Sequence, residues 1–190
     1  MNTSCRLSNV TKNYLSRFHC ILDEMIQGMT TAKLTDSISH NFIVQMIPHH
    51  RAAIEMSDNI LRYTTNIPLQ DIAASIVSEQ TKSIANMEEV LNCCSKMDSS
   101  EQDLCLYQRK TEQIMQRMFS KMEYARSTNQ INCNFMWEMI PHHMGAVEMS
   151  QNTLQYDICP ELKPILEAII TSQQKGISQM RNLLQCLGCR

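Results

Sequence analysis

The sequence has little of what a β-protein, a membrane-spanning protein or a nucleic-acid-binding protein needs. Its 190 residues include 4 glycines and 5 prolines, and aromatic residues make up 5%. Regular apolar–polar alternation is hard to find, so the composition favours an all-α fold. No apolar run approaches the roughly 20 residues that span a bilayer. A formal net charge of −2 gives no electrostatic reason to bind nucleic acid or an anionic membrane. We therefore expect neither as a partner.

The first residues, Met1 to Arg6, lack the basic-then-apolar layout of a secretory signal. A cytoplasmic location is the first expectation, with a spore coat or another assembled layer as the alternative. Cysteine and methionine are abundant instead, with 9 and 15 copies. The cysteines suggest reduced thiols, metal ligands or an unusual oxidising destination rather than an ordinary disulfide framework. Their odd number leaves at least one thiol free or paired between chains, so a homo-oligomer or a cysteine-linked assembly stays open.

An internal repeat organises the chain. The pentapeptide Met-Ile-Pro-His-His occurs at residues 46–50 and again at 139–143, and it contains four of the 6 histidines. A shift of 93 residues aligns 41–93 with 134–186 without a gap, and roughly 23 of the 53 positions are identical. The chain is therefore predicted to be a tandem duplication, with a first repeat over 1–97 and a second over 98–190.

Each repeat is predicted to form three helices, because apolar residues recur at spacings of three and four. Thr35 and Asp36 are candidate N-caps of the second helix, and Ser100 with Asp103 is a candidate capping box of the fourth. Short connections predict antiparallel neighbours in a helical bundle. The expected helices cover about 8–30, 36–65, 68–94, 101–126, 129–157 and 160–187.

Helical geometry brings the motif residues together. His50 lies about 40° from Met46 around the helix and His49 about 60° on the other side, so all three converge within one turn. Met56 lies about 10 Å further along the axis, which favours a second site or core packing. Pro48 would kink a continuous helix directly before the histidines, or it would mark the start of a new helix.

Glu55 points away from Met46, and an outer-face pair with Arg51 is its simpler role. The repeated Glu148 has the same outward direction.

Imidazole with thioether is a soft ligand set that favours copper, especially Cu(I), although another soft transition metal is possible. Zinc more often recruits thiolates or a carboxylate. A di-iron centre needs inward glutamates and Glu-x-x-His motifs, and the sequence contains no such motif. Further methionines on neighbouring helices are each more typical of core than of ligands. These are Met25, Met29, Met87, Met118, Met122 and Met180.

The motif and its surroundings resemble the domain of unknown function 305 family. The resemblance covers 40–92 and 133–187 and includes the later Gln-x-x-x-Ile-x-x-Met pattern that ends at Met87 and Met180. It implies a ferritin-like helical bundle, and some family members bind copper through the histidines and methionines of the motif. By matching position, the implied metal ligands are Met46, His49, His50, Met56, Met87, Met139, His142, His143, Met149 and Met180.

The chain departs from the family pattern at two pairs of positions. Ser83 and Gly176 stand where an acidic residue is common, which weakens any carboxylate contribution. His40 and Cys133 replace another acidic position, which would strengthen a preference for a soft metal. Near the end of the chain, Cys186 and Cys189 form a C-x-x-C pair that would hold a metal, exchange disulfides or have no role.

The function expected from these features is non-catalytic: copper buffering, storage or tolerance at the duplicated Met-x-x-His-His sites. The alternative is a structural or assembly protein that keeps a vestigial metal site and uses its cysteines as cross-links. An enzyme is the weakest interpretation, because no nucleophile, cofactor fingerprint or acid–base pair is evident.

Overall fold

The computed structural model describes residues 6–189 and contains six α-helices and no strand within that range. The helices are α1 (Asn9–Thr30), α2 (Ile38–Leu61), α3 (Ile67–Cys94), α4 (Glu101–Glu123), α5 (Ile131–Thr153) and α6 (Lys163–Cys186). The all-α prediction is confirmed. The expectation about a secretory signal rests on Met1 to Arg6, and the first five of these residues, including Cys5, lie outside the described part of the chain. Within residues 6–189, none of the helices combines the length and the apolar character of a membrane-spanning segment.

Side-chain caps set the start of four helices. The side chains of Ser8, Ser37, Asn66 and Ser100 accept hydrogen bonds from backbone N–H groups of the first helical turn. The second helix therefore begins after Ser37 and not at the expected Thr35 and Asp36. Ser100 caps α4 as expected, but its hydroxyl also donates to the Asp103 carboxylate at 2.7 Å, so the reciprocal bond of a capping box is replaced.

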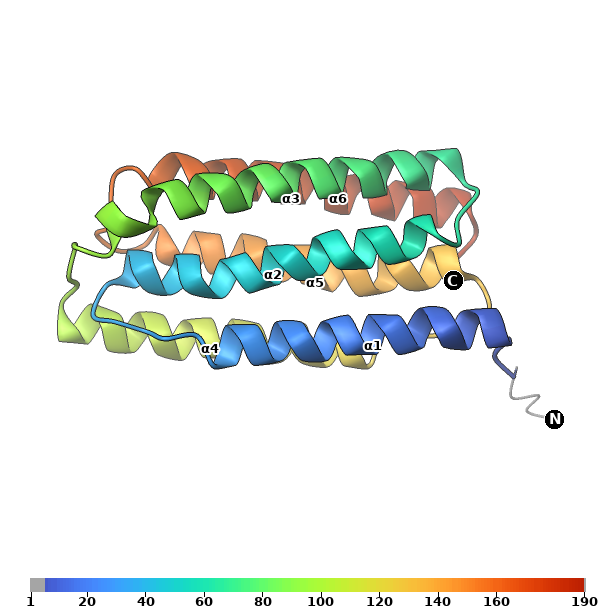
Figure 1. Cartoon of the computed structure of the whole chain (residues 1–190), viewed down its shortest axis with the longest axis horizontal. Coiled ribbons are helices and arrows are strands. Elements are labelled where there is room, and N and C mark those ends of the chain that lie inside the picture. The colour runs from blue at the N-terminus through green and yellow to red at the C-terminus, as the bar shows by residue number, and fades with distance from the viewer. Residues whose placement is uncertain (1–5, 190) are drawn as a thin grey trace.

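The two repeats pack face to face as three-helix layers (Figure 1). Within each repeat, the middle helix contacts both neighbours; between repeats, α2 packs on α5, α3 on α6 and α1 on α4. Figure 1 shows α2 and α5 crossing the centre of the bundle in opposite directions. One apolar core runs through both repeats and includes residues of all six helices. The interface between the repeats is therefore part of the core, and the two helices that carry the histidine motifs lie at its centre.

The repeated asparagines, Asn41 and Asn134, make equivalent hydrogen bonds in the two repeats. Asn41 exchanges two hydrogen bonds with the backbone of Thr35, and Asn134 does so with Thr128. These contacts fasten the loop that enters α2 or α5. They give the repeated Asn41 and Asn134 a structural role that does not involve metal binding.

Four cysteines form disulfides, in contrast to the expectation of no ordinary disulfide framework. Cys94 at the end of α3 is bonded to Cys159 in the loop before α6, with Cα atoms 5.2 Å apart. Cys133 in α5 is bonded to Cys189, with Cα atoms 5.9 Å apart. The first bond joins the two repeats, and the second closes the second repeat. Cys20, Cys93, Cys105 and Cys186 are exposed free thiols.

Candidate metal centre

The two histidine pairs, 93 residues apart in sequence, meet at the contact between α2 and α5. The rings of His49 and His142 stack with centroids 3.6 Å apart and an angle of 26° between their planes. His49 Nε2 lies 3.2 Å from the carbonyl oxygen of His142, and His142 Nε2 lies 3.1 Å from that of His49. A carbonyl oxygen only accepts, so each Nε2 carries the hydrogen. In the neutral rings, each Nδ1 therefore presents a lone pair.

His50 and His143 extend this cluster on either side. Each ring centroid lies 5.9 Å from that of the preceding histidine. His50 Nε2 lies 3.0 Å from the hydroxyl oxygen of Ser83 in α3. The equivalent neighbour of His143 is Gly176 in α6, where a Cβ atom would lie 2.9 Å from Cδ2 of the imidazole. The two halves therefore support their second histidine differently, by a hydrogen bond in one and by close backbone packing in the other.

All four Nδ1 atoms are buried and have no hydrogen-bond partner within the described part of the chain. The four side chains are between 0% and 2% exposed. A buried polar atom without a partner costs about 1–3 kcal/mol, and such atoms are rare in folded proteins. Four such atoms in one cluster form a set of nitrogen atoms that could act as metal donors.

Burial keeps these imidazoles neutral. It lowers the pKa of His50 to about 3, with a further contribution from the charge of His142, and it lowers the pKa of His142 to about 4. The pKa values of His49 and His143 lie well below 6.5 for the same first reason, and repulsion from neighbouring histidines adds to it. Neutral imidazole is the form that binds metal, so the lone pairs are available at neutral pH.

Of the two alternatives for Pro48, the structure has the continuous helix, because Pro48 lies inside α2 and Pro141 inside α5. Each proline removes one N–H from the helical ladder one residue before the histidine pair. A Cβ atom at Gly28 of α1 would lie 2.8 Å from the Pro48 ring, so the glycine allows α1 to pack closely there.

The six predicted methionine ligands are all buried and belong to the apolar core of the bundle. Met46 and Met139 lie one turn before the two pairs, on the same helices. No three of the histidines place ring nitrogens within 4.8 Å of one another in the described residues, so imidazoles alone do not form a three-ligand site. The apolar core additionally contains the thioether sulfurs of buried methionines. The buried set is Met46, Met56, Met87, Met139, Met149 and Met180.

Several sequence expectations near the site are wrong. Glu55 is on the outer face as expected, but it pairs with Arg17 of α1, while Arg51 pairs with Glu88 of α3 at 3.3 Å. Glu148 is likewise paired with Arg117, on α4.

The residues that replace the second acidic position of the family are also occupied elsewhere. His40 bonds to Ser95 at 2.8 Å, and Cys133 is in a disulfide, so neither joins the histidine cluster.

The sequence analysis does not predict the buried carboxyl group of Glu138, which lies close to the second motif. Glu138, four residues before His142, is 2% exposed and accepts a hydrogen bond of 2.5 Å from the hydroxyl of Tyr14 in α1. Burial raises the pKa of Glu138 to about 8, although the Tyr14 bond opposes the rise. The only available signal was a carboxyl at a position where the first repeat has Gln45.

Fold and site together define a class: an all-α protein of two three-helix repeats with a buried, neutral histidine cluster between them. The sequence profile of the domain of unknown function DUF305 matches residues 39–184, and the chain belongs to this family. A comparison with curated proteins gives no match.

Solved structures of CopM share the fold. CopM in a silver-bound form obtained by soaking has a TM-score of 0.58 and 26% identity, over 80% of this chain and 97% of CopM. CopM in the apo form has a TM-score of 0.57 and 27% identity, over 77% and 96%. A DUF305 fragment from Deinococcus radiodurans is 21% identical with a TM-score of 0.56, over 81% of this chain and 97% of the fragment, and shows the fold alone.

Proposed function

We propose that this protein binds a soft d10 metal ion, with Cu(I) the favoured ion, at the histidine cluster between α2 and α5. The proposed role is copper buffering, storage or tolerance, without catalysis. The observation that carries the proposal is the group of four buried, neutral imidazoles whose Nδ1 atoms have no partner among the described residues. A bound ion would give these buried nitrogen atoms a partner, and without one they cost free energy in the folded state.

The donor chemistry supports a soft ion. The core of the bundle contains buried methionines, and among the described residues no carboxylate or thiolate joins the histidines in a common 4.8 Å group of three. Thioether and imidazole together suit Cu(I), whereas magnesium and calcium require oxygen ligands. CopM was solved with silver bound, and Ag(I) is a soft d10 ion like Cu(I). His49, His50, His142 and His143 would supply nitrogen, and Met46 and Met139, one turn before the pairs on the same helices, would supply sulfur.

A Cu(I) titration of the apo protein against a competing chelator tests the proposal and gives the stoichiometry. The test variant carries glutamine in place of His49, His50, His142 and His143, which keeps size and polarity in the core. His19→Gln is the matched control, because His19 is exposed on α1. We expect the four-histidine variant to lose affinity by at least about 100-fold while the control is unchanged. Undiminished Cu(I) binding by a variant with native helical circular dichroism would refute the site.

The contribution of methionine needs a separate variant. Met46→Leu with Met139→Leu conserves side-chain volume, so stability should change by less than about 1.5 kcal/mol per site. We expect Cu(I) affinity to fall about tenfold or more while the fold is retained. An unchanged affinity would restrict the ligands to imidazole and remove the argument for a mixed soft site.

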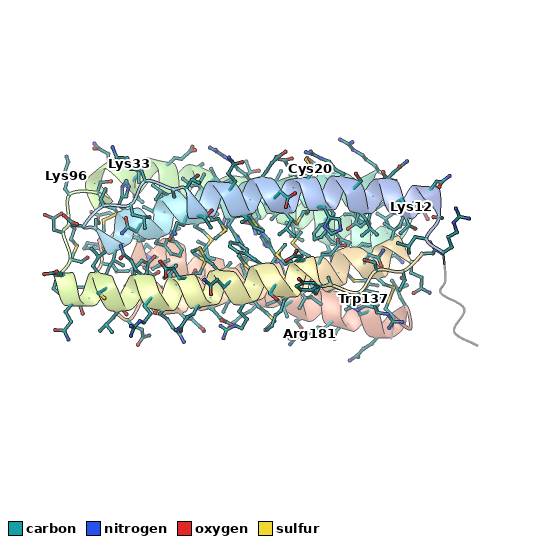
Figure 2. The ribbon with its side chains drawn as sticks, turned by 90° about the horizontal axis from the view of Figure 1, so that it is seen from below. Lys12, Cys20, Lys33, Lys96, Trp137 and Arg181 are labelled. Atoms are coloured by element: carbon teal, nitrogen blue, oxygen red, sulfur yellow. A yellow bond between two sulfur atoms is a disulfide. The ribbon has the colours of Figure 1, made fainter. Side chains whose placement is uncertain are left out.

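A second candidate, a structural or assembly protein, is favoured by a different observation. The free thiols Cys20, Cys93, Cys105 and Cys186 are exposed and lie on four different helices. Figure 2 shows Cys20 on the outer side of α1, away from the bundle interior. Such thiols would allow disulfides between chains. Non-reducing electrophoresis of native material distinguishes the two roles: ladders that collapse with reductant support assembly, and a single species supports the metal-binding role alone.

A further inference from the structure

Three cysteines from both repeats meet at the end of the bundle, away from the histidines. The sulfur atoms of Cys93, Cys94 and Cys159 all lie within 4.8 Å of one another. Among the described residues, no other group of three histidine, cysteine or acidic side chains meets this distance. Cys93 and Cys94 end α3 beside the start of α2, and His49 lies about 16 Å further along α2. The sulfur cluster is therefore separate from the histidine cluster.

Hydrogen bonds hold the cluster in place independently of its disulfide. The Ser37 hydroxyl donates to the carbonyl oxygen of Cys94 at 2.9 Å, and the N–H of Cys159 donates to the Ser39 hydroxyl at 2.9 Å. Both serines belong to the buried start of α2. These contacts fasten the two bonded cysteines to one rigid helix end. Reduction of the Cys94–Cys159 bond would therefore leave the two sulfurs close together and close to Cys93.

The surroundings of the three sulfurs favour a cation. The C-terminal end of α3 carries a partial negative charge, and Cys93 and Cys94 are its last two residues. An oxygen of the Glu161 carboxylate lies 3.0 Å from the sulfur of Cys159. This carboxylate does not come within 4.8 Å of all three sulfurs, so the site offers three sulfur ligands and no fourth ligand of histidine, cysteine or acidic type. Structural zinc takes four ligands, whereas soft thiolates without a fourth ligand suit Cu(I).

We propose that Cys93, Cys94 and Cys159 form a redox-gated thiolate site for Cu(I). A dithiol reductant converts the Cys94–Cys159 disulfide to two thiols and itself becomes a disulfide. The three thiols then each lose a proton as three copper–sulfur bonds form, and copper stays in the +1 state. In the oxidised protein, two of the three ligands are bonded to each other and the site is closed. The proposal uses no histidine, so it stands apart from the function proposed above.

The second repeat supplies a matched control. Cys186 is the residue of the second repeat that corresponds to Cys93, and it lies at the end of α6. Like Cys93, it is an exposed free thiol, and a disulfide-bonded cysteine, Cys189, lies three residues further along the chain. The residue that corresponds to Cys94 is Leu187, and Cys186 is not part of a three-ligand group. Cys93→Ser and Cys186→Ser therefore remove the same chemistry from equivalent positions, one inside the cluster and one outside it.

The test is Cu(I) titration of the full chain before and after reduction by a dithiol that is then removed anaerobically. Copper is counted by elemental analysis, and thiolate coordination is followed by ultraviolet charge-transfer absorption. The four-histidine variant should still gain one Cu(I) per chain on reduction. Cys93→Ser should abolish this gain and its absorption, whereas Cys186→Ser should keep both.

Three results would overturn the proposal. One is equal copper uptake by the oxidised and reduced chains. Another is a reduction-dependent gain that survives in Cys93→Ser. A third is displacement of Cu(I) from the reduced site by an equimolar amount of zinc. Failure of the histidine site gives a different pattern, in which the four-histidine variant binds as much copper as the unmodified protein in both redox states.

Discussion

His49 and His142 each direct Nε2 at the other's backbone carbonyl, at 3.2 and 3.1 Å, while their rings stack 3.6 Å apart. The two residues are equivalent in the repeat, so the relationship is nearly symmetric. It joins the repeats at their centre through polar contacts inside an apolar core. Each ring has the other ring as its stacking partner and the backbone carbonyl of the other residue as its hydrogen-bond acceptor.

Loss of either ring should therefore destabilise the protein, and the two losses should not add. His49→Ala and His142→Ala each remove a buried side chain and the hydrogen bond that its Nε2 donates to the other helix, at an expected cost of about 2–4 kcal/mol. The double variant should cost about 0.5–3 kcal/mol less than the sum, because the two side chains share one interaction. Urea denaturation of the apo protein measures all three, with exposed His19→Ala as a control expected within about 0.5 kcal/mol. Strict additivity would contradict the mutual arrangement.

Gly176 should resist replacement even by alanine. In an exposed helix interior, alanine in place of glycine gains about 1 kcal/mol. Here the added Cβ would lie 2.9 Å from the His143 ring, so the imidazole or the helix must shift, at about 1–3 kcal/mol. We expect Gly176→Ala to lower the melting temperature of the apo protein.

The equivalent change in the first repeat, Ser83→Ala, is the control for Gly176→Ala. It removes the hydrogen bond to His50 at a cost of about 1 kcal/mol without adding an atom. A higher melting temperature for Gly176→Ala would show that His143 does not pack as described.

Acid should destabilise the apo protein through the histidines. Their pKa values in the folded state lie below 6.5, at about 3 for His50 and about 4 for His142. Below pH 6.5, the unfolded chain therefore binds more protons than the folded one, and stability falls as the pH drops from about 6.5 toward 4. Thermal melts across this range should show the loss. The His49→Gln, His142→Gln double variant should lose less stability over the same range, and an equal loss would contradict the neutral buried state.

Glu138 should lower the stability of the folded protein as the pH rises, in contrast to the histidines, which lower it as the pH falls. Its pKa is raised to about 8 by burial, above the ordinary 4.5. Between pH 4.5 and 8, the folded protein keeps a proton that the unfolded chain has lost, so this group lowers stability as the pH rises through that window. Glu138→Gln, which introduces the residue found at Gln45, should remove the effect and stabilise the protein at pH 8 by about 1–3 kcal/mol. Melts at pH 5 and 8 measure it.

The Tyr14 bond gives an independent check on Glu138. Tyr14→Phe removes the donor to the carboxyl group but leaves the aromatic ring in place. Because that bond lowers the pKa of Glu138, the variant should make the loss of stability toward pH 8 steeper. If the variant has the pH dependence of the unmodified protein, Glu138 is not the cause of the loss of stability toward pH 8.

Sequence patterns predicted the secondary structure and the faces of the helices that are buried. The stripe through Phe42, Met46 and His49 is buried, because a spacing of three and four keeps side chains on one face of a helix. Helix ends were less accurate where two candidate caps competed, as at Ser37 beside Thr35 and Asp36. Surface ion pairs were the least accurate, since Glu55 finds Arg17 on a neighbouring helix rather than Arg51 on its own.

What the sequence by itself determined is the duplication, the six helices and the placement of each histidine pair one turn after a methionine on an inward face. These follow from local periodicity and need no knowledge of how helices meet. Only the tertiary structure decided that the two pairs share one cluster, that Ser83 and Gly176 support them differently, and that Cys159 joins Cys93 and Cys94. Such contacts join residues distant in sequence, and they depend on which helix faces pack together.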